Sequence, residues 1–319
     1  MKAAIHEEYG LANVKVEDTE KPVLKDNEVL IKVHATSVNR TDCAVLAAKP
    51  FFMRFMTGLL KPKVSILGTE FAGEVVEIGK SVTKFKLGDK VFGFNDLNFT
   101  TQAEFMTIAE DGVLDTMPKN ASFDEAAVSI EGAFYGYNFI NKVKIGSDSK
   151  VLVNGGTGGI GSATIQLLKH FDAYVVATCK EEHAELVKSL GADRVICYDL
   201  EDFTKDNQKY DFVFDTVGKS SFFKCRGILK SKGVYISSEL GYLSQNIFLP
   251  LVTPLFGGKK TIFPIPVGCR KFIHFLKELI EKEEFKAVID RKYTLSEIKE
   301  AYAFVDSGQK VGNVVITIV

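Results

Sequence analysis

A glycine-rich segment places the tightest limit on how this chain can fold. Residues 151–169 read VLVNGGTGGIGSATIQLLK, in which a short apolar run is followed by five glycines within seven residues and then by an apolar-periodic stretch. This order predicts a buried strand, a tight turn and a helix. Gly156, Gly158 and Gly161 have the spacing G-x-G-x-x-G, which in this context is typical of a turn that holds the pyrophosphate of a dinucleotide.

Each of these three glycines has a predicted task. Gly156 permits the sharp exit from the strand, Gly158 lets a phosphate approach a backbone without Cβ, and Gly161 lets the helix pack closely. The helix N-terminus offers N–H groups and partial positive charge to the phosphates. The expected cofactor contacts in the turn are Gly156, Thr157, Gly158, Gly159, Ile160 and Gly161. The alternative is a glycine-rich turn in an ordinary α/β protein.

The rest of the chain shows two kinds of pattern. In the first third, strand candidates lie between Gly, Asp and Pro residues, at 29–39, 71–79 and 90–94. From Asp124 onward short apolar strands alternate with helices, which predicts a doubly wound parallel sheet. The expected helices are 124–142, 159–170, 181–190, 220–229 and 269–285, and the expected strands are 151–154, 174–178, 194–198, 211–217, 233–238 and 311–319. We therefore predict an α/β protein with a β-rich domain at 1–122 and a dinucleotide-binding domain at 123–286.

Composition excludes several functional classes. The net charge is −1, so no general attraction to nucleic acid or to an anionic membrane is expected. No stretch reaches the roughly 18 uncharged apolar residues of a membrane-spanning helix. The nearest, 246–258, contains two prolines and is expected to be buried or to pack in an interface. The N-terminus lacks the apolar core of a signal peptide. Five cysteines without a CxxC pair indicate a reducing, cytoplasmic setting.

The end of the second predicted strand of the sheet, at residues 177–180, bears on the choice of cofactor. An acid at this place would bind the ribose 2′-hydroxyl of NAD, and none stands there. Thr178 and Lys180 are candidate contacts, with Lys180 pairing the 2′-phosphate of NADP. Glu181 and Glu182 would repel that phosphate if they faced it, although acids in a first helical turn commonly face water. The pattern favours NADP over NAD, and the alternative for Lys180 is an exposed surface position.

Longer motifs resemble the medium-chain dehydrogenase/reductase superfamily. Its signature is similar to GTEFAGEVVEIGKSVTKFKLGDKVFGF (68–94). Its quinone-oxidoreductase branch, the zeta-crystallin-like proteins, is resembled by NGGTGGIG (154–161), LVKSLGADRVICY (186–198), YDFVFDTVGK (210–219) and the closing residues 287–319. The resemblance implies a GroES-like first domain that is completed by 287–319, a Rossmann domain, and a homodimer.

The resemblance also bears on zinc. Zinc-dependent members of the superfamily place a Cys and a His as metal ligands where this chain has Asn39 and Thr69. Neither neutral side chain is a good zinc ligand, and the cysteine-rich structural zinc lobe is absent from the sequence. We therefore expect a zinc-free enzyme. Since zinc stabilises the alkoxide in alcohol oxidation, such an enzyme is a poor candidate for simple alcohol oxidation. Its expected substrate is a small, apolar acceptor that is already electron-poor, either a quinone or an α,β-unsaturated carbonyl.

Further site residues are implied by the resemblance. Residues that match Asn39 and Asp42 lie near the nicotinamide in the zinc-free branch, and one that matches Tyr198 lies near the 2′-phosphate and adenine. The alternatives are a turn or helix cap for Asn39 and Asp42 and sheet-edge packing for Tyr198. Tyr135 stands where the branch often has a cofactor-contacting threonine. It is a candidate proton donor, and the alternative donors are a ribose hydroxyl and solvent.

Three functions are compatible with these features. The one we favour is a zinc-free NAD(P)H-dependent reductase. The others are a cofactor-binding scaffold or regulatory protein with little turnover, and a zinc-independent alcohol dehydrogenase. The Phe- and Met-rich segment 49–63 is interpreted either as a lid over a hydrophobic acceptor or as an amphipathic helix packed on the core or on a partner.

Overall fold

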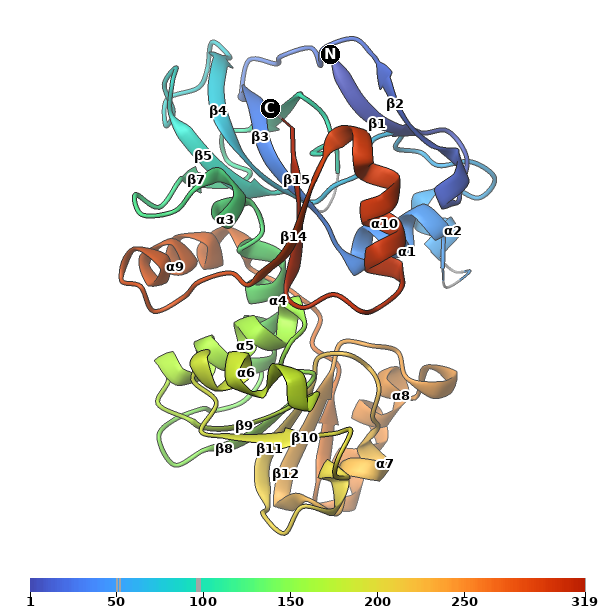
Figure 1. Ribbon diagram of the computed structural model, residues 1–319, viewed down its shortest axis with the longest axis vertical. Coiled ribbons are helices and arrows are strands. Elements are labelled where there is room, and N and C mark those ends of the chain that lie inside the picture. Colours follow the sequence, from blue (N-terminus) through green and yellow to red (C-terminus); the bar gives the residue numbers. More distant parts are fainter. Residues whose placement is uncertain (50, 52, 96–98, 319) are drawn as a thin grey trace. The chain divides into compact units, whose positions relative to one another are not determined.

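The computed structural model describes residues 1–49, 51, 53–95 and 99–318, which form two compact units. Unit 1 joins residues 1–131 with 268–319, and unit 2 is residues 132–267. Figure 1 shows the elements of both units in the colours of the sequence. These limits differ from the predicted domain boundaries at 122/123 and 286/287. The reason is that α3 (Phe123–Ala127) and α9 (Cys269–Glu281) pack on strands of unit 1.

Unit 1 is built on a seven-stranded sheet. The strand order is β14-β15-β3-β4-β5-β7, and β6 pairs with β3 outside this path. The strands are β3 (Glu28–Val38), β4 (Glu70–Ile78), β5 (Lys90–Phe94), β6 (Phe105–Ala109), β7 (Val113–Thr116), β14 (Ile289–Thr294) and β15 (Asn313–Thr317). The alternating residues Val29, Ile31 and Val33 of β3 are fully buried. The C-terminal strand β15 pairs antiparallel with β3, so the end of the chain completes a sheet that begins at residue 28.

The remaining elements of unit 1 pack around this sheet. Strands β1 (Lys2–His6) and β2 (Val14–Asp18) form a two-stranded antiparallel sheet. The helices, besides α3 and α9, are α1 (Arg40–Ala47), α2 (Met53–Thr57) and α10 (Ile298–Asp306). Ile298 and Tyr302 of α10 pack in one apolar cluster with Leu46 of α1. Burial of this cluster holds α1 against the C-terminal part of the chain.

Unit 2 has the predicted parallel sheet. Its order is β10-β9-β8-β11-β12-β13, and every neighbouring pair is parallel. The strands are β8 (Lys150–Asn154), β9 (Tyr174–Cys179), β10 (Arg194–Cys197), β11 (Tyr210–Asp215), β12 (Leu229–Ser237) and β13 (Lys260–Ile262). The chain leaves β8 toward β9 on one side and later returns beside β8 as β11. Ligands of doubly wound proteins bind at such a switch point, beyond the carboxyl ends of the two strands.

Helices cover both faces of this sheet (Figure 1). The helices α5 (Gly159–His170) and α6 (Ala184–Ser189) lie on one side. On the other side, α7 (Phe222–Cys225) and α8 (Gln245–Val252) contribute Phe222, Cys225 and Leu249 to a cluster with Leu152 of β8. The strands are therefore buried from two directions, which explains apolar runs such as VLV (151–153) and VYI (234–236).

Tertiary contacts change two of the predicted helices. The helix expected near 124–142 is two helices, α3 and α4 (Ile130–Ile140). The carboxylate of Glu70 accepts hydrogen bonds from the backbone N–H groups of Ile130 (3.0 Å) and Glu131 (2.5 Å), and so caps a new helix there. The helix expected at 220–229 is confined to α7, because residues 229–237 belong to β12.

The apolar segment 246–258 is largely exposed within this chain. Leu251 of α8 is 72% exposed, and Leu255 and Phe256 are 80% and 81% exposed. The expectation of burial is therefore wrong for these side chains, and packing in an interface remains a prediction. Across the described parts of the chain, each helix is either too short or too polar to traverse a bilayer.

Candidate functional site

The glycine turn between β8 and α5 is the predicted phosphate-binding site. Its left-handed residue is Gly155, with φ of 90°, rather than Gly156. The N–H of Gly156 donates to the carbonyl of Thr178 at 2.8 Å, which ties the turn to the end of β9. A Cβ on Gly161 would lie 2.0 Å from the carbonyl oxygen of Gly155. Gly161 is therefore required by the turn itself, because any side chain there would displace it.

Gly158 differs from its neighbours, because the protein leaves space around it. It is the N-cap residue of α5, with φ of −69°. A Cβ at this position would meet only ordinary contacts, at 3.7 Å from Gly155 O and 3.9 Å from Val217 Cγ1. The fold therefore does not need a glycine here, whereas a bound pyrophosphate at the helix N-terminus would. Gly156, Thr157, Gly159 and Ile160 are in the same turn or at the start of α5, and their contact with a dinucleotide stays a prediction.

A buried network of hydrogen bonds holds the turn to the ends of the neighbouring strands. This network was not predicted from the sequence. The carboxylate of Asp215, at the end of β11, accepts a hydrogen bond from Asn154 Nδ2 at 2.9 Å. Thr178 donates its hydroxyl to Asn154 Oδ1 at 2.8 Å, and accepts from the N–H of Gly155 at 2.9 Å. Thr178 is fully buried, so its side chain belongs to this network rather than to an open cofactor surface. An acid inside the apolar strand DFVFD was the signal available in the sequence.

The residues expected at the adenosine end lie together beside β9 and β10. Lys180 follows β9 and Tyr198 follows β10, and the last residues of these two strands, Cys179 and Cys197, are register partners. Tyr198 is half exposed. Lys180 forms an exposed ion pair with Glu182, with 3.4 Å between Nζ and Oε1. Glu182 is thus solvent-exposed, as expected, but it also partly neutralises the lysine that was predicted to bind a 2′-phosphate.

Unit 1 contains a second polar cluster, around Asn39. Asn39 Nδ2 donates to Glu70 Oε2 at 2.7 Å and to Glu131 Oε2 at 3.0 Å. The hydroxyls of Thr69 and Thr41 each donate to Glu131 at 2.6 Å. Asn39, Thr69, Glu70 and Glu131 are all buried. Asn39 and Thr69 were singled out from the sequence, but their partners Glu70 and Glu131 were not, because no local pattern joins these glutamates to Asn39.

Asp42 has the capping role that was the alternative for it. Its carboxylate accepts from the N–H of Asn39 at 2.8 Å and from the N–H of Gly68 at 3.1 Å. The first of these bonds closes the N-terminus of α1 as in a capping box. Asn39 and Asp42 are both buried, and their side chains already have protein partners. A contact of either residue with the nicotinamide stays a prediction.

Burial controls the ionisation of this cluster. It raises the pKa of Glu70 to about 7, with repulsion from Glu131 as the second cause. The pKa values of Glu131 and Asp42 are raised by burial as well. Burial lowers the pKa of Lys310, while Glu131 and Glu70 oppose this effect. The cluster therefore favours protonated carboxyl groups at a pH where exposed carboxylates are ionised.

The two positions that hold zinc ligands in zinc-dependent relatives carry occupied hydrogen-bond donors. The Asn39 amide and the Thr69 hydroxyl both donate to Glu131. Amide and hydroxyl groups are poor zinc ligands compared with thiolate and imidazole. Within the part of the chain that the structure describes, no group of three or more His, Cys, Asp or Glu residues is arranged to hold a metal ion.

Tyr135 and the segment 49–63 are only partly characterised by the structure. Tyr135 is half-buried on α4, with its ring centroid 6.1 Å from that of Phe134, and its role as proton donor stays a prediction. In the segment, Met53 packs against the core cluster of α1 and α10, whereas Phe51 and Phe55 are 68% and 69% exposed. A short packed helix is therefore present. Residues 50 and 52 lie outside the described residues.

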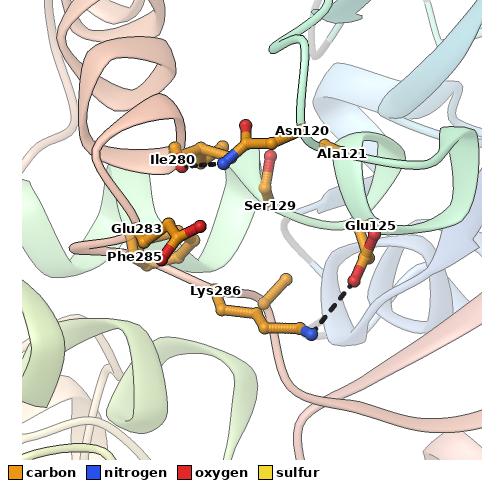
Figure 2. Close-up of a pocket in the computed structure, with 9 residues that line it drawn as sticks. Asn120, Ala121, Glu125, Ser129, Ile280, Glu283, Phe285 and Lys286 are labelled. Carbon is orange, nitrogen blue, oxygen red and sulfur yellow. Dashed lines mark hydrogen bonds and ion pairs between the residues drawn. The ribbon is translucent and has the colours of Figure 1, made fainter.

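A cavity of about 310 Å³ in unit 1 is separate from all of these residues (Figure 2). Its lining includes Asn120, which donates to the carbonyl of Ile280 at 2.7 Å. Lys286 and Glu125 form an ion pair at 3.3 Å across it, as Figure 2 shows. Because these polar groups already have protein partners, the cavity is not the site that the sequence predicts.

Comparison with known proteins agrees with the geometry. Residues 25–133 match the family described as alcohol dehydrogenase GroES-like domain, and residues 190–316 match the family described as zinc-binding dehydrogenase. The chain is 33% identical to the 2-methylene-furan-3-one reductase of Solanum lycopersicum, over 99% of this chain and 79% of that protein. It is 30% identical to the chloroplastic NADPH-dependent alkenal/one oxidoreductase of Arabidopsis thaliana, with the same coverage.

A solved structure shares the whole architecture. The quinone oxidoreductase from Coxiella burnetii superposes with a TM-score of 0.88 and 26% sequence identity, covering 100% of this chain and 99% of that one. Both units and the strand orders described above are thus those of a GroES-like domain combined with a Rossmann domain. The chain belongs to the medium-chain dehydrogenase/reductase superfamily, in its quinone-oxidoreductase branch, a family of oxidoreductases.

Proposed function

We propose that this protein is an NAD(P)H-dependent reductase that transfers hydride to a small, apolar quinone or α,β-unsaturated carbonyl without zinc. The observation that carries the proposal is the open space at Gly158, where the fold itself would tolerate a side chain. The similarity to an alkenal/one oxidoreductase and to a quinone oxidoreductase supports the class of acceptor.

In this proposal the chain binds and orients the cofactor and the acceptor, and the nicotinamide supplies the hydride. The turn at Gly158 and the N-terminus of α5 hold the pyrophosphate, and Lys180 with Tyr198 contacts the adenosine. Asn39 is proposed to lie near the nicotinamide. An electron-poor acceptor needs no Lewis acid to accept hydride, which suits a cluster whose metal positions are Asn39 and Thr69.

The test is NADPH oxidation by the purified protein with a panel of quinones and enones, followed at the absorbance of the reduced nicotinamide. We expect sustained turnover with at least one acceptor class and none with simple primary alcohols and NADP⁺. Cofactor binding without turnover on the whole panel would instead favour a scaffold or regulatory protein. Turnover with alcohols alone would favour a zinc-independent alcohol dehydrogenase.

We expect NADPH to bind more tightly than NADH because of Lys180. Replacing Lys180 by alanine should weaken NADPH binding about three- to tenfold and leave NADH binding nearly unchanged, since a charge-assisted bond at an exposed position is partly screened. Glu182→Ala should strengthen NADPH binding slightly, because it removes the 3.4 Å ion pair that competes for the lysine. Calorimetric titration of both cofactors gives the ratio.

Lys188→Ala is the matched control, because Lys188 also forms an exposed ion pair, with Glu185 at 2.9 Å in the same unit. This variant should leave both affinities unchanged. An unaltered NADPH/NADH ratio in Lys180→Ala would show that Lys180 is only a surface residue and would remove the main support for NADP.

The purified protein is expected to contain no stoichiometric zinc. The physical reason is that Asn39 and Thr69 offer an amide and a hydroxyl, both engaged by Glu131. Elemental analysis after dialysis measures this directly. One tightly held zinc per chain would contradict the proposal.

The proposed assembly is a homodimer in a reducing compartment such as the cytoplasm. Exposed apolar side chains on α8 and after it, among them Leu251 and Phe256, support contact with a second copy, since monomers seldom expose such patches. All five cysteines are free thiols, which supports the reducing setting.

A further inference from the structure

We propose that Asp215 is a positioning residue that holds the glycine turn in the conformation that binds the cofactor. The proposal rests on the proposed function, because it explains how the same turn is kept ready for a pyrophosphate. Asp215 is linked to the turn through Asn154 and Thr178. It is the last residue of β11 and is fully buried, beside β8 at the switch point of the sheet.

The carboxylate of Asp215 is saturated with uncharged donors. Oδ1 accepts from Asn154 Nδ2 at 2.9 Å and from the N–H of Gly218 at 3.0 Å. Oδ2 accepts from the Tyr235 hydroxyl at 2.8 Å and from the N–H of Ser220 at 3.1 Å. Both oxygens of Asp215 are acceptors in all four bonds, so Asp215 determines which way each of these partners points.

The orientation of Asn154 in turn determines the orientations of Thr178 and of the backbone N–H of Gly155. Asn154 must present its Nδ2 to Asp215, so its Oδ1 faces Thr178 and accepts the Thr178 hydroxyl at 2.8 Å. With its hydrogen committed in that direction, Thr178 Oγ1 presents lone pairs to the N–H of Gly155 at 2.9 Å. Gly155 is the left-handed residue of the turn. One acceptor-only group thus selects a single orientation for the amide, the hydroxyl and the backbone N–H.

Asp215 also anchors the segment that packs on the opposite side of the turn. The Thr216 hydroxyl donates to the carbonyl of Asn154 at 2.8 Å. A Cβ on Gly155 would lie 2.3 Å from Val217 Cγ1, so this valine occupies the space beside the turn. The bonds from Gly218 and Ser220 to Asp215 hold this segment in place. The turn is therefore clamped between residues 216–220 and the end of β9.

The sheet alone does not explain this arrangement. Strands β8 and β11 are paired in register as far as Asn154 and Asp215, so backbone bonds already fix the two strands. The side-chain network joins the last paired residues of β8, β9 and β11 and reaches from them to Gly155, where the turn begins. Its loss should therefore alter the turn more than the sheet, and cofactor affinity should report it.

The first experiment compares cofactor binding by wild type and by Asp215→Asn, which is nearly isosteric. We expect the affinities for NADPH and NADH to fall by the same factor, about tenfold, because the new NH2 group replaces one of the two acceptor oxygens and faces a buried N–H donor, whichever way the amide lies. The turn then loses its fixed orientation. The NADPH/NADH ratio should not change, in contrast to Lys180→Ala. In turnover, the KM for the cofactor should rise, while kcat at saturating cofactor and the KM for the acceptor stay as in wild type.

Thr178 gives a second test that disturbs the fold less. Thr178→Val removes the hydroxyl and should weaken both cofactors, whereas Thr178→Ser keeps it and should restore binding to near the wild-type value. Because the residues act in one chain of hydrogen bonds, the double variant Asp215→Asn/Thr178→Val should bind the cofactors about as tightly as the weaker-binding single variant. Full additivity would show two independent effects and contradict the proposal.

Two matched controls weaken a polar interaction elsewhere in unit 2. Thr253→Val removes the bond to the carbonyl of Leu249 (2.9 Å), and Asp206→Asn removes the charge that pairs with Arg194 (2.8 Å). Both should lower the free energy of unfolding without changing cofactor affinity. If they weaken cofactor binding as much as Asp215→Asn does, the effect is general destabilisation and positioning by Asp215 is wrong.

The outcomes separate this proposal from the proposed function. If the folded wild-type protein binds neither NADPH nor NADH, the proposed function fails. If wild type binds and turns over but folded Asp215→Asn binds both cofactors with unchanged affinity, the function stands and only the positioning role is overturned. A wild-type-like Thr178→Val would overturn it equally, since the path from Asp215 to Gly155 runs through that hydroxyl.

Discussion

Replacing Gly158 by valine is expected to abolish cofactor binding while the chain stays folded. The backbone at Gly158 has φ of −69° and ψ of 165°, which any residue adopts. A Cβ there meets the protein only at 3.7 Å and 3.9 Å. The valine side chain would instead occupy the space of a pyrophosphate, so we expect NADPH affinity to fall by about 100-fold or more.

Two other variants make this result specific. Gly158→Ala should reduce affinity less, because a single methyl group fills less of the space. Gly161→Ala should lower the free energy of unfolding as well as binding, since its Cβ would lie 2.0 Å from the Gly155 carbonyl oxygen. Calorimetric titration and urea unfolding together separate the two cases. Unchanged NADPH affinity in folded Gly158→Val would refute the assignment of the turn.

The second large effect is expected at Glu131 and concerns stability. Glu131→Ala leaves the hydroxyls of Thr41 and Thr69 without their acceptor and leaves Asn39 without one of its acceptors. Even after relief of carboxylate repulsion, we expect a loss of about 3 kcal/mol in the free energy of unfolding. Glu131→Gln retains an acceptor oxygen for Asn39 and Thr69, and the Thr41 hydroxyl can rotate to accept from the new amide. This variant should be as stable as wild type or more stable at neutral pH.

The same cluster predicts a pH dependence with a definite sign. The pKa of Glu70 is raised to about 7 in the folded state, above the value near 4.3 expected in the unfolded chain. The folded protein then binds more protons than the unfolded chain between these values, so its stability should fall as pH rises from about 4.5 through about 7. Glu131→Gln removes the charge that repels Glu70, so the slope should become shallower.

Urea unfolding of wild type and both variants at several pH values between about 5 and about 8 measures these effects. Exposed Glu185→Gln is a suitable control, because its side chain is 89% exposed, and its stability curve should follow that of wild type. A Glu131→Gln variant that loses as much stability as Glu131→Ala, with an unchanged pH slope, would contradict this account of the cluster.

Local sequence was sufficient for the parts of the fold that depend on neighbouring residues. The apolar run before five glycines predicted β8, the turn and α5, and the structure has α5 at Gly159–His170 as expected. The alternation of short apolar strands with helices predicted the parallel sheet of unit 2. These features follow from periodicity and backbone freedom over a few residues, which a sequence displays directly.

Contacts between distant residues decided what the sequence could not show. The start of α4 depends on Glu70, about sixty positions earlier, because its carboxylate caps the N–H groups of Ile130 and Glu131. The polar cluster joins Asn39, Glu70 and Glu131 through side-chain hydrogen bonds, and no local pattern reveals that they meet.

The candidate site divides in the same way. The sequence by itself predicted a phosphate-binding turn at Gly158, since the spacing of glycines between a strand and a helix is a local property. Only the tertiary structure decided that Gly155 carries the left-handed conformation and that Thr178 is buried rather than open. It also brought Asp215 to the turn through Asn154. The physical reason is that parallel pairing joins strands separated by whole helices, so partners at the carboxyl edge of the sheet are chosen by topology rather than by sequence distance.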